Sequence, residues 1–121
     1  MKKIAIIDDE SSILEMLKKF LSRKNLFEIS TYDNPVTALN SLKRNKYDLI
    51  LCDIMMPQMT GIDVVKEIKK EIPNQKIIMM TAFSTEEKMI ECDDLEVTDY
   101  LTKPFISMRD VENKVLTNLN L

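Results

Sequence analysis

The amino-acid sequence predicts an α/β fold in which a parallel β-sheet is covered by helices on both faces. Short runs of apolar and β-branched residues recur along the chain, segments with helical spacing separate them, and polar residues follow where the runs end. Strict alternation of strand and helix is typical of parallel sheets, because each crossover needs a helix to return the chain to the same edge.

Five segments are expected to form strands. Four have the length and β-branched content of strands buried on both faces, whereas the second is weaker and alternates between apolar and polar residues. The segments are Ile4–Ile7, Glu28–Tyr32, Leu49–Cys52, Ile77–Met80 and Val97–Leu101. For a chain of 121 residues we expect one domain, residues 1–121, with a flavodoxin-like doubly wound sheet of order 2-1-3-4-5 and five helices.

Five segments are expected to form the helices. The first carries a capping-box pattern, Ser12 followed three residues later by Glu15, and the second has Asn34-Pro35 as N-cap and first residue. The fourth, around Thr85–Cys92, has the weakest apolar face. The apolar faces of the others are formed by Ile13, Leu17, Phe20 and Leu21; by Val36, Leu39 and Leu42; by Val65, Ile68 and Ile72; and by Met108, Val111, Val115 and Leu119.

Composition excludes several classes of function. The net charge of −3 provides no basic face and argues against direct nucleic acid binding by this chain. No apolar run approaches the ~20 residues that span a bilayer, and the amino terminus lacks the apolar run of a signal peptide, so we expect a cytoplasmic protein with no membrane segment. The chain has no histidine, which excludes Ser-His catalysis, a His-ligated zinc site and a phosphohistidine carried by the chain itself.

Polar side chains cluster in the sequence at the carboxyl ends of four predicted strands. They are Asp8 and Asp9 after the first, Asp53 after the third, Thr81 after the fourth and Lys103 after the fifth. In an open α/β sheet this edge binds ligands where the strand order reverses. Converging carboxylates need a compensating cation, and oxygen ligands suit Mg²⁺ or Mn²⁺.

A carboxylate nucleophile, a divalent cation, an ammonium and a hydroxyl are the groups that phosphoryl transfer requires. Each residue alone has a plainer interpretation, since Asp after a strand is often a helix cap or turn residue and Lys103 alone would be an ordinary surface lysine. Four strand ends that deliver complementary groups favour a phosphoacceptor pocket centred on Asp53.

These residues resemble the receiver domain of two-component response regulators. The resemblance extends over essentially the whole chain and rests on four stretches in the family's order. They are Ile6-Ile7-Asp8-Asp9-Glu10, Asp53-Ile54-Met55-Met56-Pro57 with Gly61 four residues on, Thr81-Ala82, and Tyr100-Leu101-Thr102-Lys103-Pro104-Phe105. The resemblance implies a phosphorylation-dependent signalling switch rather than an enzyme with its own substrate.

The resemblance also implies roles for the pocket residues. Asp53 would be the phosphoacceptor, and Lys103 and Thr81 would contact phosphoryl oxygens. Asp9 would bind the metal directly together with Asp53 and the backbone carbonyl of Met55, while Asp8 would act largely through water. Tyr100 stands at the family's switch-aromatic position, and a cis Lys103-Pro104 bond is implied. With Met55 and Phe83 flanking the path of hydrolytic water, we expect slow self-dephosphorylation.

The implied donor is a histidine kinase or a histidine phosphotransfer protein. An unknown effector protein would recognise the face formed by the fourth helix, the fifth strand and the fifth helix. The protein would be a monomer or a phosphorylation-dependent dimer. The family commonly has Gly-Ala before the fifth strand, where this chain has Glu96-Val97, so the end of the fourth helix needs another cap. For Gly61, the sequence suggests a flexible turn before the third helix.

Three alternatives stay open from the sequence. The chain is a working receiver, standing alone or forming part of a longer DNA-binding transcription factor. A pseudo-receiver would keep the fold and bind partners constitutively. An enzyme on the same fold, such as a flavin carrier or a phosphoester hydrolase, fits poorly because Asp8, Asp9 and Glu10 would repel a phosphate.

Overall fold

The structure is a computed structural model and describes residues 1–82 and 94–121. Its strands form one sheet in the order β2-β1-β3-β4-β5, and each neighbouring pair is parallel. This confirms the predicted flavodoxin-like doubly wound sheet. The strands are β1 (Lys2–Ile7), β2 (Phe27–Tyr32), β3 (Leu49–Asp53), β4 (Ile77–Thr81) and β5 (Asp99–Thr102).

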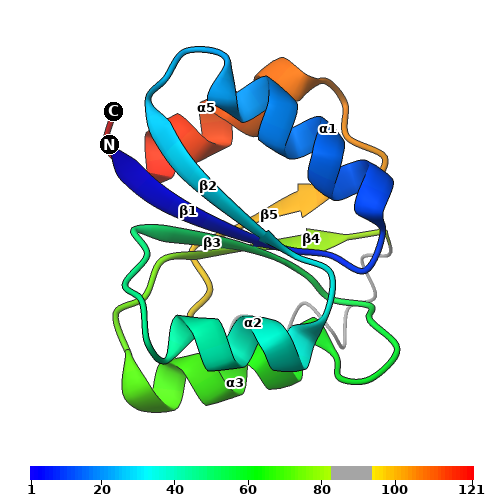
Figure 1. Cartoon of the computed structure of the whole chain (residues 1–121), viewed down its shortest axis with the longest axis vertical. Helices are drawn as coiled ribbons and strands as arrows, with labels where there is room; N and C mark the ends of the chain where they lie inside the picture. The colour runs from blue at the N-terminus through cyan, green and yellow to red at the C-terminus, as the bar shows by residue number, and fades with distance from the viewer. Residues whose placement is uncertain (83–93) are drawn as a thin grey trace.

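Helices cover both faces of the sheet, with α1 and α5 on one side and α2 and α3 on the other (Figure 1). Within the described residues these four helices are α1 (Ser11–Ser22), α2 (Pro35–Leu42), α3 (Gly61–Glu71) and α5 (Met108–Asn118). The helix expected around Thr85–Cys92, and with it Phe83, lies outside the described residues. None of the described helices is long and apolar enough to cross a membrane.

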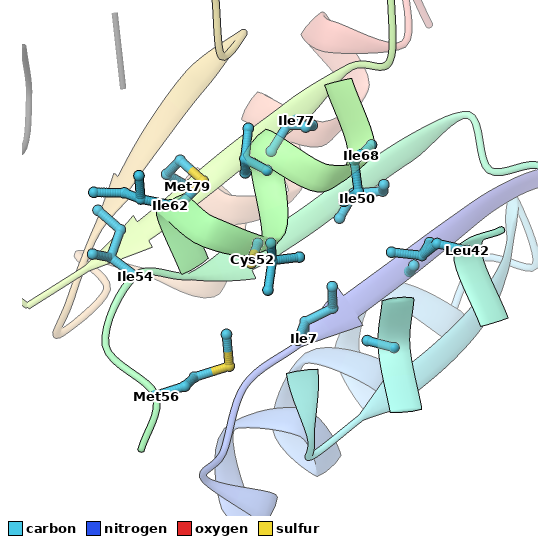
Figure 2. Close-up of a cluster of buried hydrophobic side chains, with 14 residues drawn as sticks. Ile7, Leu42, Ile50, Cys52, Ile54, Met56, Ile62, Ile68, Ile77 and Met79 are labelled. Atoms are coloured by element: carbon cyan, nitrogen blue, oxygen red, sulfur yellow. The ribbon is translucent and has the colours of Figure 1, made fainter. Parts of the chain in front are cut away.

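The middle of the sheet is buried because β1, β3 and β4 are apolar on both faces, whereas the edge strands β2 and β5 are only partly buried. Along β1, Ile4 and Ile6 join the core under α1 and α5, whereas Ala5 and Ile7 join the core under α2 and α3. Figure 2 shows the second of these cores. In β1, β3 and β4, alternation between two buried faces accounts for the continuous apolar runs of the sequence, and the polar side chains of these three strands stand only at the strand ends.

The helix starts were predicted in part. The Asn34 side chain caps α2 by accepting hydrogen bonds from the amides of Val36 and Thr37, at 2.9 and 3.2 Å, as expected. The capping box of Ser12 was wrong, because Glu10 is the N-cap of α1 and makes no side-chain cap. The Glu10 amide instead donates to Asp8 Oδ1 at 2.9 Å, so a residue of the pocket fixes the entry into α1.

The last strand begins two residues later than predicted because the chain turns at Glu96. This residue has a φ of 59°, in the left-handed region that favours glycine. The chain then meets β4 at Thr98, whose amide donates to the Ile77 carbonyl at 2.8 Å and whose hydroxyl accepts from the Ile77 amide at 3.1 Å. The strand itself starts only at Asp99.

Glu96→Gly is therefore expected to stabilise the protein by about 0.5–1 kcal/mol, because glycine adopts a positive φ without a steric cost. Urea unfolding at neutral pH measures the change. Glu96→Ala is the matched control, since it removes the same carboxylate but keeps a Cβ. An equal gain from both variants would assign the effect to the lost charge and contradict the backbone explanation.

Candidate functional site

The predicted site residues meet at the carboxyl edge of the sheet. Asp53 ends β3 and Thr81 ends β4, while Asp8 directly follows β1 and Lys103 directly follows β5. The pairing of Ile7 with Cys52 puts the ends of β1 and β3 side by side. The site therefore lies where the strand order reverses, as the sequence predicted.

Lys103 stands at the centre of the charged groups. Its Nζ donates to Asp8 Oδ2 at 2.5 Å and lies 3.4 Å from Asp53 Oδ2 and 3.9 Å from Glu10 Oε1. The Lys103 side chain is only 11% exposed and that of Asp8 is fully buried. Little solvent screens the pairs of Lys103 with Asp8 and Asp53, so these two interact more strongly than surface pairs, whereas Glu10 is largely exposed.

The carboxyl group of Asp53 is buried at the end of β3, with 4% of the residue exposed. Its Oδ1 accepts a hydrogen bond from the Met55 amide at 3.3 Å. Burial, reinforced by the nearby charge of Asp8, raises the pKa of Asp53 to about 6, against the opposing effect of Lys103. The carboxyl is therefore largely ionised, and nucleophilic, at neutral pH.

The neighbouring carboxylates stabilise the positively charged form of Lys103. Burial alone would lower the pKa of its ammonium, but the hydrogen bond to Asp8 and the charges of Asp53, Asp8 and Glu10 raise the pKa above its usual value. Lys103 is thus a fixed positive charge under all ordinary conditions. It can meet an anionic group that arrives at Asp53.

The pocket also offers oxygen ligands for a cation. One carboxylate oxygen each of Asp8, Asp9 and Glu10 lies within 4.8 Å of the others, and Asp9 and Glu10 are exposed. With Asp53 these make four carboxylates at this edge of the sheet, and three of them, Asp8, Glu10 and Asp53, lie within 4 Å of the Lys103 ammonium. A hard divalent cation would offset this excess of negative charge. The donor set fits Mg²⁺ or Mn²⁺. Glu10 was not predicted as a site residue, since its place depends on how the chain enters α1.

The other predicted residues surround this pocket. Thr81 is buried, and its carbonyl accepts a hydrogen bond from the Lys103 amide at 2.7 Å, which ties the ends of β4 and β5 together. Tyr100 is partly buried against the core under α2 and α3. Met55, whose amide donates to Asp53, is 50% exposed. The Lys103–Pro104 peptide bond is cis, as the resemblance implied.

The structure explains the glycine at position 61 by close packing and not by the flexible turn that the sequence suggested. Gly61 is the first residue of α3, and its φ is not positive. A Cβ built on Gly61 would lie 2.0 Å from the carbonyl oxygen of Asp53, much closer than any real contact. Glycine is needed here because α3 packs directly on the backbone of the Asp53 strand end.

Fold and site together define a doubly wound α/β protein with a buried acidic group, an acidic cluster and a lysine at its ligand-binding edge. The chain belongs to the response regulator receiver domain family, whose model matches residues 4–116. Receiver domains are phosphoacceptor signalling domains of two-component systems rather than classical enzymes, and they generally bind Mg²⁺ at an acidic pocket.

Relatives of two lengths share this domain. The chain is 36% identical to the chemotaxis protein CheY of Thermotoga maritima, over 94% of the chain and 97% of that protein. It is 38% identical to the nisin biosynthesis regulatory protein NisR of Lactococcus lactis, over 97% of the chain but only 50% of NisR. The chain thus spans about half the length of some relatives and nearly all of others.

Solved structures have the same fold. A CheY-like receiver domain protein from Methanospirillum hungatei superposes with a TM-score of 0.92 and 27% identity, over 99% of this chain and 94% of that one. The response regulator TrrA of Thermotoga maritima, solved in complex with Mg²⁺-BeF, gives a TM-score of 0.85 and 33% identity, over 98% and 99% of the two chains.

The raised pKa of Asp53 predicts how stability depends on pH. Ionisation of this carboxyl is less favourable in the folded chain, so its contribution is fully present below pH 3.8 and is lost as pH rises to about 6. In metal-free buffer, Asp53→Asn should therefore be more stable than the wild type at pH 7, by on the order of 2 kcal/mol, but not at pH 4.

Urea unfolding of both proteins at pH 4, 5, 6 and 7 with a chelator present measures this difference. Asp33→Asn, which removes an exposed carboxylate, is the control and should leave the difference between variant and wild type flat. Added Mg²⁺ should reduce the advantage of Asp53→Asn by stabilising the wild type. A difference that does not grow with pH would rule out the assigned cause.

Proposed function

We propose that this chain is a phosphorylation-dependent switch whose phosphoacceptor is Asp53. The observation that carries the proposal is the setting of this carboxylate, which is buried, held at one oxygen by the Met55 amide and faced at the other by Lys103. One oxygen of Asp53 would attack the phosphorus of a phosphohistidine. The P–N bond breaks, and the leaving imidazole nitrogen keeps the electron pair and takes up a proton.

The other pocket residues have complementary roles in this proposal. Lys103 would pair with a phosphoryl oxygen, and the hydroxyl of Thr81 would donate to another after transfer. Asp8, Asp9, Asp53 and the carbonyl of Met55 would hold Mg²⁺ or Mn²⁺, with Asp8 acting largely through water. When bound, the cation offsets the charge that gathers on the phosphoryl oxygens. The Mg²⁺-BeF complex of TrrA, 33% identical to this chain, supports a magnesium-dependent reaction.

The output would follow from movements at the ends of β4 and β5. Thr81 would move toward the phosphoryl group, and Tyr100 would turn into the space that this movement opens. The signal would reach a partner at the face of the fourth helix, β5 and α5. The resting contacts of β5 on that face support this part, since Lys114 of α5 donates to the Tyr100 carbonyl and lies 3.6 Å from Asp99.

The phosphodonor would be a histidine kinase or a histidine phosphotransfer protein in the cytoplasm. A cavity of about 520 Å³ adjoins the site between α1 and the segment that follows β5, and Glu10 and Lys103 belong to its wall. Its apolar lining suits a protein surface that presents an imidazole to Asp53. The apolar residues are Ile13, Met16, Ala82, Pro104, Phe105 and Met108.

Residues 1–121 would form a single receiver domain without direct nucleic acid binding, as a monomer or a phosphorylation-dependent dimer. Its relation to relatives of two lengths supports two contexts, a stand-alone regulator such as CheY or the receiver part of a longer regulator such as NisR. The intact pocket of Asp8, Asp9, Asp53, Thr81 and Lys103 favours a working receiver over a pseudo-receiver.

Phosphorylation by a purified phosphohistidine donor tests the proposal. The wild type should gain one phosphoryl group in intact-mass spectra when Mg²⁺ is present and none when the metal is chelated. Asp53→Ala should gain none, whereas Lys103→Met should react at least about tenfold more slowly. Asp33→Asn, at an exposed carboxylate outside the pocket, should react like the wild type. Equal labelling of Asp53→Ala would place the acceptor elsewhere.

The phosphoryl group should be lost slowly, because Met55, two residues after Asp53, has an exposed apolar side chain and no group that orients a water molecule. Met55→Asn supplies such a group, and we expect it to shorten the half-life of the phosphoprotein by about threefold or more. Intact-mass spectra after removal of the donor measure the decay. Met55→Leu keeps the apolar side chain and should decay like the wild type; an equal half-life for Met55→Asn would refute this account.

A further inference from the structure

Lys69, near the end of α3, places its ammonium among three backbone carbonyl oxygens. Its Nζ donates to the carbonyls of Pro73 at 3.0 Å, Gln75 at 3.1 Å and Glu96 at 3.3 Å. An ammonium has three donors, so this set uses its whole capacity. The arrangement has no part in the pocket chemistry described above.

The three carbonyls belong to two parts of the chain that are far apart in sequence. Pro73 and Gln75 lie between α3 and β4, whereas Glu96 lies just before β5 and is 27 residues from Lys69. Glu96 is also the residue with a φ of 59°, which costs a side-chain-bearing residue conformational energy. Lys69 therefore holds in place a strained turn that glycine would adopt freely.

That turn sets the start of the strand on which two site residues depend. Two residues after Glu96, Thr98 exchanges hydrogen bonds with Ile77, and from Asp99 onward β5 runs in register with β4. Tyr100 lies in this short strand and Lys103 follows it directly. A shift at Glu96 would be carried along a strand of only four residues to the pocket.

The opposite end of α3 is fixed to the phosphoacceptor strand. The Gly61 amide donates to the Ile54 carbonyl at 2.8 Å, and the helix start leaves no room for a Cβ beside the Asp53 carbonyl. From Gly61 to Lys69 the helix rises about 12 Å. One rigid element thus connects the backbone at Asp53 with the entry to β5.

We propose that Lys69 is a positioning residue for the phosphoacceptor site. By holding the Glu96 carbonyl it fixes the entry to β5 relative to α3, and so places Lys103 and Tyr100 relative to Asp53. This inference rests on the proposed function of Asp53 and Lys103. It also explains how this chain holds a turn with a positive φ at Glu96, where the family commonly has a glycine.

The neighbouring Lys70 provides a matched control. It has the same charge and lies on the same helix, but it is exposed and pairs with Glu67 Oε1 at 3.0 Å one turn back. Lys69→Met and Lys70→Met therefore make the same change in charge and composition. Only the first removes the donors to the three carbonyls.

The experiment measures binding of beryllofluoride with Mg²⁺ by titration calorimetry, for proteins whose folding is checked by urea unfolding. Lys69→Met should weaken the apparent affinity by about three- to tenfold, while Lys70→Met should bind like the wild type. Adding Glu96→Gly to Lys69→Met should restore most of the affinity, because glycine holds the turn without the lysine. A loss of stability alone would not produce this pattern among folded proteins.

Wild-type affinity in Lys69→Met, or a double variant as weak as the single one, would overturn the inference. If Lys69→Met does not fold, Lys69→Gln, which keeps one donor group, takes its place with the same expected rescue. Failure of the wild type to bind beryllofluoride would have a different meaning, since it would overturn the proposed function itself.

Discussion

Two carboxylates, Asp8 and Asp53, are buried at the adjoining ends of β1 and β3, and the ammonium of Lys103 lies between them. Burial of like charges side by side is unfavourable, and the raised pKa of Asp53 records that cost. The cost is confined to the strand ends, because the interiors of β1, β3 and β4 belong to the two apolar cores. The site is thus stabilised by whatever adds positive charge to it and responds when that charge changes.

The strand order makes this site possible. In the order β2-β1-β3-β4-β5 the chain leaves β1 toward one side and β3 toward the other, which opens the carboxyl edge between Asp8 and Asp53. The groups that face these two carboxylates come from the next two strands. Thr81 ends β4 and has a hydroxyl, and Lys103 directly follows β5 and has an ammonium. Because the Lys103 amide also donates to the Thr81 carbonyl, the cationic group and the strand end beside it are mechanically connected.

The sheet order and the pocket could be predicted from the sequence because both depend on local patterns. Asp53 and Lys103 follow apolar runs, and parallel topology alone brings such strand ends together. Features that depend on three-dimensional approach could not be predicted in this way. The need for Gly61 arises from the nearby Asp53 carbonyl, and the contact of Lys69 with Glu96 crosses 27 residues. The sequence did indicate that Glu96 stands where the family commonly has a glycine, but it did not predict the hydrogen bond from Lys69 to the Glu96 carbonyl.

On the proposed function, phosphorylation sets up a competition for Lys103. The ammonium donates to Asp8 in the resting chain, and a phosphoryl group on Asp53 would add roughly 1.5 to 2 negative charges on the other side. A metal held by the acidic cluster would offset the charge of Asp8 and Asp9, so that Lys103 could turn to the phosphoryl oxygens. Because the Lys103 amide is hydrogen-bonded to the Thr81 carbonyl, a movement of Lys103 would then shift the ends of β4 and β5 together. The cation would therefore contribute to the switch as well as to the reaction, because it would allow the lysine to change partners.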